Sequence, residues 1–368
     1  MHPDNEEYLV RHIQTTSINI EQEIDNLLTL CVPPNSKNQS LYRAMLSTII
    51  RMAEADRNRW DAKIMMQTLR EMEHAFSVLE QFKRRRKVTV FGSARTNKEH
   101  PLYQLAHSVG AQLAQHSLMT VTGAGGGIMA AAHEGAGFEY SLGLNIALPF
   151  EQHANTVVHG TNHLLSFHFF FLRKLFFVKE ADAVVLFPGG FGTLDEALEV
   201  LTLVQTGKSP IVPIILVDLE NGTYWKEALQ FIKYQLEDPH YIQASDMNLM
   251  RLVHRAEDVV SEISTFYGNY HSSRWLKDQF VIRMNYALHE DALKELQDKF
   301  SSLCITDSFV QQPYCEKDAE EQEFCHLIRL GFNFNGKDQG QLRTLIDFIN
   351  CPTHWLKNQA GSHGASKY

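Results

Sequence analysis

The 368-residue chain is long enough for one large domain or two to three smaller ones, and its 44% hydrophobic and 21% charged residues are typical of a folded globular protein and exclude extensive disorder. Its 34 Lys and Arg against 43 Asp and Glu give a net charge of −9, so the protein as a whole repels nucleic acid and we expect no such partner. Five cysteines without a CxxC pair, or a metal-ligand spacing to histidine, predict reduced thiols, a cytoplasmic location and no metal site.

Residues 1–86 predict a helical N-terminal region. The acidic start lacks the apolar core of a signal peptide. Apolar residues recur at helical spacing over 18–28, Pro33 and Pro34 stop that helix, and 40–82 carries a second apolar stripe without proline or glycine. We interpret the stripes as core or interface faces, which favours self-association. The basic run 83–87 is interpreted as a solvated boundary segment.

From residue 87 to 266, strands and helices alternate on short loops. The predicted strands are 88–91, 119–122, 142–148, 183–187 and 211–217, and the predicted helices are 102–116, 128–134, one from Thr193 and one from Tyr224. This alternation predicts an α/β domain with a doubly wound parallel sheet. The most apolar stretch, 164–178, is too short to span a bilayer and contains charged residues, so no membrane partner is expected.

The alternation stops beyond Tyr267, and residues 267–368 predict a mixed, α-rich C-terminal region. We expect helices at 284–300 and 342–349, a mixed acidic segment at 307–323 and a disordered tail from about 359.

Two glycine-rich turns, 123–127 and 188–192, lie where a predicted strand meets a predicted helix. Backbone N–H groups and the helix dipole make such turns anion sites, and glycine lets the backbone approach phosphate oxygens. Because the two strands belong to one sheet, we expect a single crevice at the carboxyl ends of the strands.

The turns do not match the common nucleotide patterns. The run 207–209 reads GKS, but Thr202 stands where a Walker motif requires glycine. Residues 125–130 fit the dinucleotide frame GxGxx(G/A), yet the next strand has no acidic residue at its end, and Glu151 comes too late to bind a ribose. A dinucleotide-dependent oxidoreductase therefore stays open only as a weaker alternative.

The second turn is followed by a carboxylate. Thr193 can donate its hydroxyl and N–H to phosphate, and Glu196 lies one helical turn further on, where it can face the same crevice. The structural alternative is that Glu196 simply stabilises the start of the helix.

Three cations are further candidate contacts. Arg173 lies in an apolar stretch, where it needs an acidic partner or a substrate phosphate or ribose. Lys174 points about 100° away, toward the ligand or into solvent. Arg95, after the first strand, is a candidate phosphate contact.

Taken together, four segments resemble the LONELY GUY (LOG) family, long labelled "lysine decarboxylase-like". The signature PGGxGTxxE is matched at every fixed position, and the resemblance covers about 88–275, which suggests the long form of the family. The segments are Phe91–Arg95, Thr122–Ala132, Phe170–Lys174 and Pro188–Glu196.

The resemblance implies a modified Rossmann fold and hydrolysis of nucleoside 5′-monophosphates, AMP or cytokinin riboside monophosphates, to free base and ribose 5-phosphate. It implies a homodimer or larger assembly, no cofactor, and Glu196 with Arg173 as the catalytic pair. The residues implied to hold the phosphate or line the nucleotide site are Gly189, Gly190, Gly192, Thr193, Gly125, Gly126, Gly127 and Ser93.

The chain departs from the family at one turn. Long-form members read GGGPGIMEA, whereas residues 123–131 read GAGGGIMAA, so that Gly126 replaces a proline and Ala130 replaces an acidic residue. A nucleotide-binding or sensing module without turnover is therefore the alternative function. The chemistry itself is consistent with an enzyme, since a carboxylate such as Glu196 can stabilise an oxocarbenium-like ribose and orient the attacking water without a metal.

Overall fold

The computed structural model describes residues 18–147, 154–277, 279–306, 308–313 and 324–356, and the chain divides into two compact units, Met1–Arg70 and Glu71–Tyr368. Within the described residues, no helix has the length and apolar character that crossing a bilayer would take. The predicted tail from about 359 lies outside the described residues, as does most of the acidic segment. The predicted boundaries after residues 86 and 266 stay predictions.

The described part of the first unit, from residue 18 on, is helical, as predicted. Helix α2 (Ile18–Cys31) ends just before the proline pair, and α3 (Gln39–Glu54) and α4 (Arg59–Leu79) follow. The apolar stripe over 40–82 is not one helix, because the chain breaks at residues 55–58. Asp56 adopts a positive φ of 38° there, and the Asn58 side chain accepts hydrogen bonds from the N–H groups of Trp60 and Asp61, at 2.9 and 3.0 Å, which starts α4.

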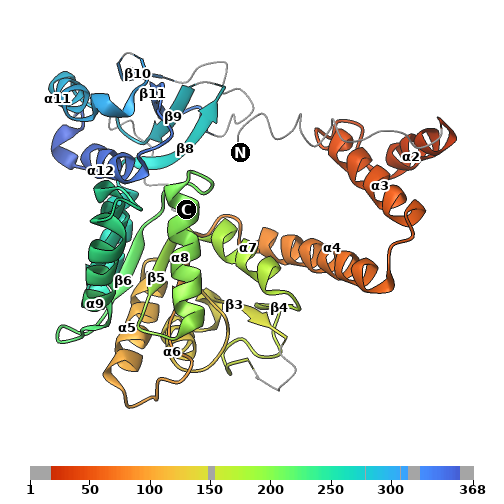
Figure 1. Ribbon diagram of the computed structural model, residues 1–368, viewed down its shortest axis with the longest axis horizontal. Helices are drawn as coiled ribbons and strands as arrows, with labels where there is room; N and C mark the ends of the chain where they lie inside the picture. The colour runs from red at the N-terminus through yellow and green to blue at the C-terminus, as the bar shows by residue number, and fades with distance from the viewer. Residues whose placement is uncertain (1–17, 148–153, 278, 307, 314–323, 357–368) are drawn as a thin grey trace. The chain divides into compact units, whose positions relative to one another are not determined.

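The second unit contains the predicted doubly wound parallel sheet, now with seven strands in the order β4-β3-β2-β1-β5-β6-β7 (Figure 1). All of its pairings are parallel. The order reverses between β1 and β5, because the chain first winds outward to β4 and then outward the other way to β7. The strands are β1 (Lys87–Phe91), β2 (Met119–Thr122), β3 (Ser141–Ile146), β4 (Leu164–Phe167), β5 (Ala183–Leu186), β6 (Ile214–Val217) and β7 (Met250–Val253).

Strands β4 and β7 are the two that sequence analysis does not predict. Both are edge strands of four residues with partly exposed positions, so neither shows the continuous apolar run of a central parallel strand. The apolar stretch 164–178 is divided between β4 and helix α7 (Phe170–Glu180).

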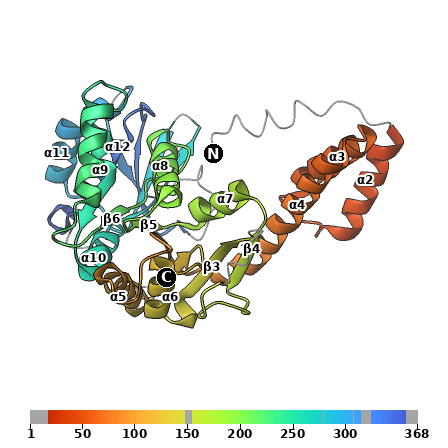
Figure 2. The ribbon, with the colours of Figure 1, turned by 60° about the horizontal axis from the view of Figure 1, so that its bottom comes forward.

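Helices cover both faces of the sheet (Figure 2). One face packs against α5 (Pro101–Gln115), α6 (Ile128–Ala136) and α10 (Ala256–Phe266), and the other packs against α7, α8 (Phe191–Gln205) and α9 (Tyr224–Ile232). Strand β5 shows the alternation, since Val185 packs toward the first set while Val184 and Leu186 pack toward the second. The short helical turns are η1 (Glu80–Phe82), η2 (Phe138–Tyr140), η3 (Lys233–Glu237), η4 (Ala244–Leu249), η5 (Ser301–Leu303) and η8 (Pro352–His354).

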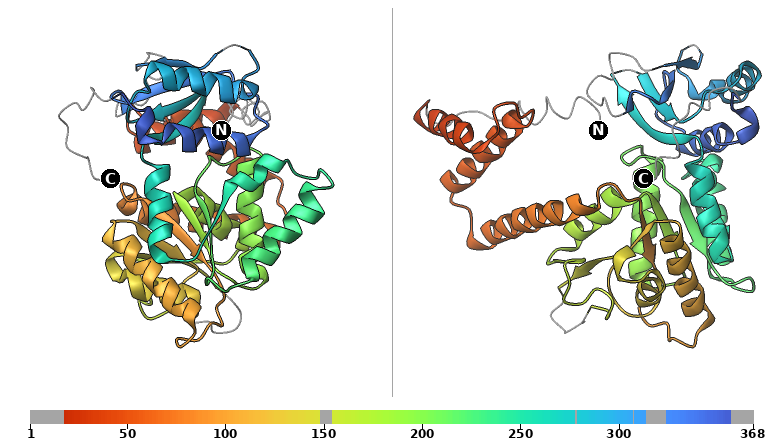
Figure 3. Two further views of the ribbon diagram at one scale, coloured as in Figure 1. Left: turned by 90° about the vertical axis from the view of Figure 1, so that its left-hand side faces the viewer. Right: turned by 180° about the vertical axis from the view of Figure 1, so that it is seen from behind.

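The C-terminal region contains a four-stranded antiparallel sheet that sequence analysis does not predict, in the order β10-β11-β9-β8. Figure 3 draws it in cyan and blue, separate from the parallel sheet. The prediction that a helix starts at Met284 is wrong, because the buried run up to Met284 forms a strand and the His289 side chain caps the helix that follows. The elements are β8 (Tyr270–Leu276), β9 (Gln279–Met284), α11 (Glu290–Phe300), β10 (Val310–Gln312), β11 (Ile328–Phe332) and α12 (Gln339–Ile349).

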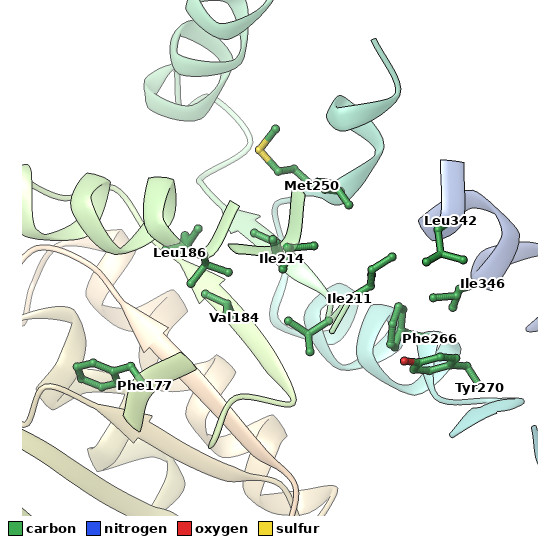
Figure 4. Close-up of a cluster of buried hydrophobic side chains, with 14 of the residues drawn as sticks. Phe177, Val184, Leu186, Ile211, Ile214, Met250, Phe266, Tyr270, Leu342 and Ile346 are labelled. Carbon is green, nitrogen blue, oxygen red and sulfur yellow. The ribbon is translucent and has the colours of Figure 1, made fainter. Parts of the chain in front are cut away.

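Helix α12 joins this region to the parallel sheet's core. Leu342 and Ile346 lie beside Phe266 and Tyr270 in one continuous apolar cluster (Figure 4). The buried Asn350 side chain accepts hydrogen bonds from the N–H groups of residues 269 and 270, both at 2.8 Å.

Candidate active site

The loops after β1, β2 and β5 meet where the strand order reverses. Ser93, in the loop after β1, forms backbone hydrogen bonds with the loops after β2 and β5. Its N–H donates to Pro188 O at 3.1 Å, and its carbonyl accepts from Ile128 N–H at 3.0 Å. The two predicted glycine turns therefore follow β2 and β5, the strands on either side of β1, and lie at the carboxyl ends of these strands. This is the usual ligand site of such folds.

Packing requires glycine at two positions in these turns. A Cβ on Gly127, which has φ +60°, would lie 2.2 Å from Ser93 O, and a Cβ on Gly189 would lie 2.1 Å from Thr193 Oγ1. A Cβ on Gly190 or Gly192 would meet no described atom within 4 Å. The space beside Gly190 and Gly192 is therefore open.

This difference predicts the cost of added methyl groups. Gly127→Ala should lower the free energy of unfolding by about 2–4 kcal/mol, because the methyl meets backbone and φ is positive. Gly190→Ala, the matched control, should change it by less than about 0.5 kcal/mol. Urea unfolding of both variants measures this, and equal losses would contradict the geometry.

Unpaired N–H groups line both turns. Among the described residues, the N–H groups of 125–127 and of 189–192 donate to no acceptor, whereas the next ones, Thr193 and Leu194, donate to Gly190 O at 3.0 and 3.2 Å. Thr193 is buried, and the neighbouring Phe191 is 94% exposed. The starts of α6 and α8 thus present free donors and positive helix dipoles, the arrangement that binds anions.

Glu196 is buried one turn into α8, at 3% exposure. Its Oε1 lies 3.2 Å from Lys174 Nζ, and its buried Oε2 has no hydrogen-bond partner in the described part of the chain. Burial raises the pKa of Glu196, against the lowering effect of Lys174 and Arg173, and nearby Glu199 raises it further. Glu196 is therefore a carboxylate poised to accept a proton.

Lys174 joins α7 to α8. Its ammonium lies 2.6 Å from Glu199, 2.9 Å from Asp195 and 3.2 Å from Glu196. The alternative of a solvated Lys174 is wrong, because its side chain is only 14% exposed. Burial acts to lower the pKa of Lys174, but its ion pairs with Glu199, Asp195 and Glu196 raise it overall.

Arg173 faces the other way, toward the β2 turn. Its Nη1 would lie 3.7 Å from a Cβ on Gly123, and its guanidinium carbon lies 5.0 and 5.5 Å from the ring centres of Phe170 and Phe177. Its buried Nε has no hydrogen-bond partner among the described residues. Burial lowers the pKa of Arg173, although the charges of Glu196 and Asp195 act to raise it. Arg173 is thus a half-buried cation with unused donor capacity beside the turn.

The other predicted residues lie on the same loops. Arg95 has an exposed side chain, and its N–H donates to Ser93 Oγ at 3.1 Å. Gly125 is buried and Gly126 is exposed.

Sequence analysis does not single out three residues of this region as members of the site. Gly123 borders Arg173, Tyr224 donates its hydroxyl to Gly189 O at 2.8 Å, and Asn155 donates to the carbonyl of Gly125 at 3.3 Å. Gly123 could have been found within its glycine run. Tyr224 and Asn155 lie 35 and 30 residues from their partners and carry no local signal. Among the described residues, no three His, Cys, Asp or Glu side chains gather as a metal site.

Comparison with known proteins identifies the relatives of this site. Residues 126–263 match the family model described as "Possible lysine decarboxylase", and this segment contains Arg173, Lys174 and the whole turn from Pro188 to Glu196. The curated relatives in that comparison include LOG enzymes. Over this segment the chain is similar to the LOG family. The resemblance deduced from the sequence motifs is therefore confirmed.

Two curated relatives and one solved structure illustrate the extent of the similarity. The probable cytokinin riboside 5′-monophosphate phosphoribohydrolase LOGL5 of Oryza sativa subsp. japonica is 26% identical over 52% of this chain and 77% of its own length. The pyrimidine/purine nucleotide 5′-monophosphate nucleosidase of Escherichia coli is 27% identical over 51% of this chain and 44% of its own length. The molybdenum cofactor binding protein of Rippkaea orientalis is 19% identical, with a TM-score of 0.36, over 50% of this chain and 97% of that one.

Proposed function

We propose that this protein hydrolyses the N-glycosidic bond of nucleoside 5′-monophosphates, releasing the free base and ribose 5-phosphate. The observation that carries the proposal is Glu196, a buried carboxylate with a raised pKa and one unpartnered oxygen, next to two turns of free N–H groups. The names of the relatives support the same substrate class, since both name nucleoside or nucleotide 5′-monophosphates.

In this proposal the two halves of the site divide the work. The N–H groups of 189–192, Thr193 and Arg173 hold the phosphate and ribose, with the 125–127 turn, Arg95 and Ser93 lining the nucleotide site. Lys174 orients Glu196 rather than the phosphate, because three carboxylates already surround its ammonium. The contacts to the phosphate are remote from the reacting carbon, so their binding energy can be used to position the ribose.

Glu196 acts on the reacting carbon. As the bond from C1′ to the base nitrogen breaks, its electron pair goes to the base, and the carboxylate stabilises the positive charge that develops on the ribose. A water oxygen then bonds to C1′ and its proton passes to Glu196, while the departing base takes up a proton from solvent. Glu196 releases its proton to solvent, which restores the carboxylate and completes the addition of one water across the bond. The step needs neither a metal nor a cofactor.

A panel of nucleoside monophosphates tests the proposal. AMP, GMP, CMP, UMP and a cytokinin riboside monophosphate are incubated with the protein, and free base and ribose 5-phosphate are quantified. We expect at least one nucleotide to be cleaved, with Glu196→Gln inactive. The hydrolase is excluded if no nucleotide is cleaved and Glu196→Gln behaves as the unchanged protein.

Ala130 favours the alternative, a nucleotide-binding or sensing module without turnover. Ala130 lies in α6 at the position where long-form LOG family members carry an acidic residue. Its buried methyl group leaves this position of the nucleotide site uncharged. This alternative predicts saturable AMP binding by calorimetry with no product, and rapid cleavage of bound AMP would rule it out.

The charge of Lys174 should help to set the pH at which cleavage is lost on acidification. Its charge lowers the pKa of Glu196, so Lys174→Met should raise that pKa further. Protonated Glu196 cannot accept the water proton, so activity should be lost at higher pH on acidification than in the unchanged protein. The acid limb of kcat/KM against pH measures this. An unmoved acid limb would show that Glu196 does not set it.

The same region favours the homodimer or larger assembly expected from the resemblance. Five large apolar side chains on α7 and α8 are 46–94% exposed, namely Phe170, Phe171, Leu175, Phe191 and Leu198. Light scattering should give at least twice the mass of one chain, and Leu198→Glu should shift it toward one chain. A monomer at micromolar concentration would contradict the assembly.

A further inference from the structure

A chain of hydrogen bonds lies beneath the Gly123–Gly127 turn, centred on the fully buried His133 of α6. Its Nε2 lies 3.2 Å from Thr122 Oγ1 at the end of β2. On the other side, its Nδ1 lies 3.4 Å from Asn155 Oδ1 and 3.2 Å from Asn155 Nδ2. The imidazole thus joins two polar side chains that are 33 residues apart in the sequence.

Both ends of this chain of bonds reach the backbone of the turn. Thr122 Oγ1 accepts the N–H of Ala124 at 2.9 Å. Asn155 donates its backbone N–H to Ala124 O at 2.7 Å and its side-chain amide to Gly125 O at 3.3 Å. The inward-facing polar groups of residues 124 and 125 are therefore held, while the N–H groups of 125–127 stay free of described acceptors.

A neutral imidazole satisfies every group in the chain. With the proton on Nδ1, His133 donates to Asn155 Oδ1 and Nε2 accepts from the Thr122 hydroxyl. With the proton on Nε2, His133 donates to Thr122 Oγ1 and Nδ1 accepts from Asn155 Nδ2, the closer of the two amide atoms. Thr122 Oγ1 can then still accept from Ala124, and the Asn155 amide can still donate to Gly125. Burial lowers the pKa of His133 to about 4, which keeps the ring neutral near pH 7.

The turn needs this support because its backbone is strained. Ala124 adopts φ +58°, a left-handed conformation that a residue with a Cβ rarely takes, and it is fully buried. The Cβ of Ala124 packs directly against Gly143, and a Cβ added at Gly143 would lie only 2.8 Å from it. The neighbouring Gly123 borders Arg173. A shift of the turn would therefore move both the free N–H groups and the wall beside Arg173.

We infer that His133 is a positioning residue of the nucleotide site, whose neutral ring holds the Gly123–Gly127 turn in its ligand-binding conformation through Thr122 and Asn155. The inference rests on the proposed function for its assay, but it makes a separate statement about the turn. His133 touches no ligand itself. Because the turn binds ground state and transition state alike, loss of its hydrogen-bonded support should act on KM and on product affinity rather than on kcat.

Thr122 offers the sharpest test, because valine keeps the shape of threonine and removes only the hydroxyl. Thr122→Val should raise the KM for AMP about tenfold with kcat within about threefold, and should weaken ribose 5-phosphate binding by a similar factor in calorimetry. His133→Phe should act in the same direction. Thr122→Ser, which keeps the hydroxyl, should stay within about twofold of the unchanged protein.

Ser141→Ala is the matched control. Ser141 is fully buried, and its hydroxyl donates to Gly137 O at 2.7 Å and to the backbone carbonyl of His133 at 3.4 Å, so it contacts the backbone of the helix and no hydrogen bond joins it to the imidazole. Its loss should lower the melting temperature but leave KM unchanged, which separates positioning from general stability. If His133→Phe does not fold, Thr122→Val decides alone.

The outcomes separate this inference from the proposed function. Cleavage by the unchanged protein, with unchanged KM and ribose 5-phosphate affinity in Thr122→Val, overturns the inference only. If no nucleotide is cleaved, the proposed function fails, and ribose 5-phosphate binding by the unchanged protein and Thr122→Val still decides the inference. If the unchanged protein binds neither AMP nor ribose 5-phosphate, both are overturned.

Discussion

Glu196→Gln should lower kcat for nucleotide cleavage by about a thousandfold and leave the dissociation constant for AMP within about threefold. The amide has the size of the carboxylate but carries no charge to stabilise the ribose cation and cannot take a proton from water. It keeps its place in the buried start of α8, next to Lys174. Single-turnover kinetics and calorimetry with AMP measure the two effects separately.

Glu199→Gln is the control for this variant. It makes the same chemical change on the same helix, and Glu199 also pairs with Lys174, at 2.6 Å. Glu199 is part-exposed, whereas Oε2 of Glu196 is buried and unpartnered in the described residues. We expect a loss of less than about tenfold, through the altered field on Glu196. Equal losses in both variants would indicate that the helix needs its negative charge and that Glu196 has no special role.

Arg173→Met should lower kcat/KM by about a hundredfold, mostly through KM, and weaken ribose 5-phosphate binding in parallel. Methionine keeps the apolar contact with Phe177 and removes the guanidinium that lies beside Gly123 with unused donor capacity. Calorimetry with ribose 5-phosphate and with inorganic phosphate distinguishes a phosphate contact, which both ligands report, from a ribose contact, which only the first reports.

Lys179→Met is the control for the loss of positive charge. Lys179 lies on the same helix, but it is about half exposed and pairs with Glu180 at 2.6 Å, in the last turn of α7. It should change kcat/KM by less than about twofold. The proposed role of Arg173 fails if Arg173→Met also stays within twofold, or if both variants weaken binding to the same degree.

The two glycine turns and the carboxylate after the second turn are the parts of the site that can be predicted from the sequence. A buried parallel strand shows as a short apolar run, and the glycines follow it directly, so each strand–turn–helix unit is visible within about ten residues. Arg173 is likewise visible, because a cation inside an apolar run needs a partner. Family resemblance adds the reaction, because its signature combines these units.

The contacts between these units cannot be predicted in this way. Lys174 lies next to Arg173 in the chain, yet it faces the carboxylates of α8 while Arg173 faces the β2 turn. Helical spacing separates the two directions but does not say which neighbouring helix either one meets. The hydrogen bonds of Ser93 to both turns, and those of His133 beneath one of them, join residues tens of positions apart.

The edge strands and the C-terminal sheet also depend on contacts between segments that are distant in the sequence. β4 and β7 are short and partly exposed, and β9 is a buried run next to a helix-forming segment, so their pairing partners rather than their own residues make them strands. By itself the sequence determined the strand–glycine–helix units and the doubly wound class of the sheet, and it singled out the candidate acid and cation of the proposed site, because local apolar runs and glycines encode these features. Only the tertiary structure decided that Lys174 is buried against Glu196, that Arg173 borders the β2 turn and that His133 supports that turn, because burial and hydrogen bonding depend on residues that the chain brings together only when it folds.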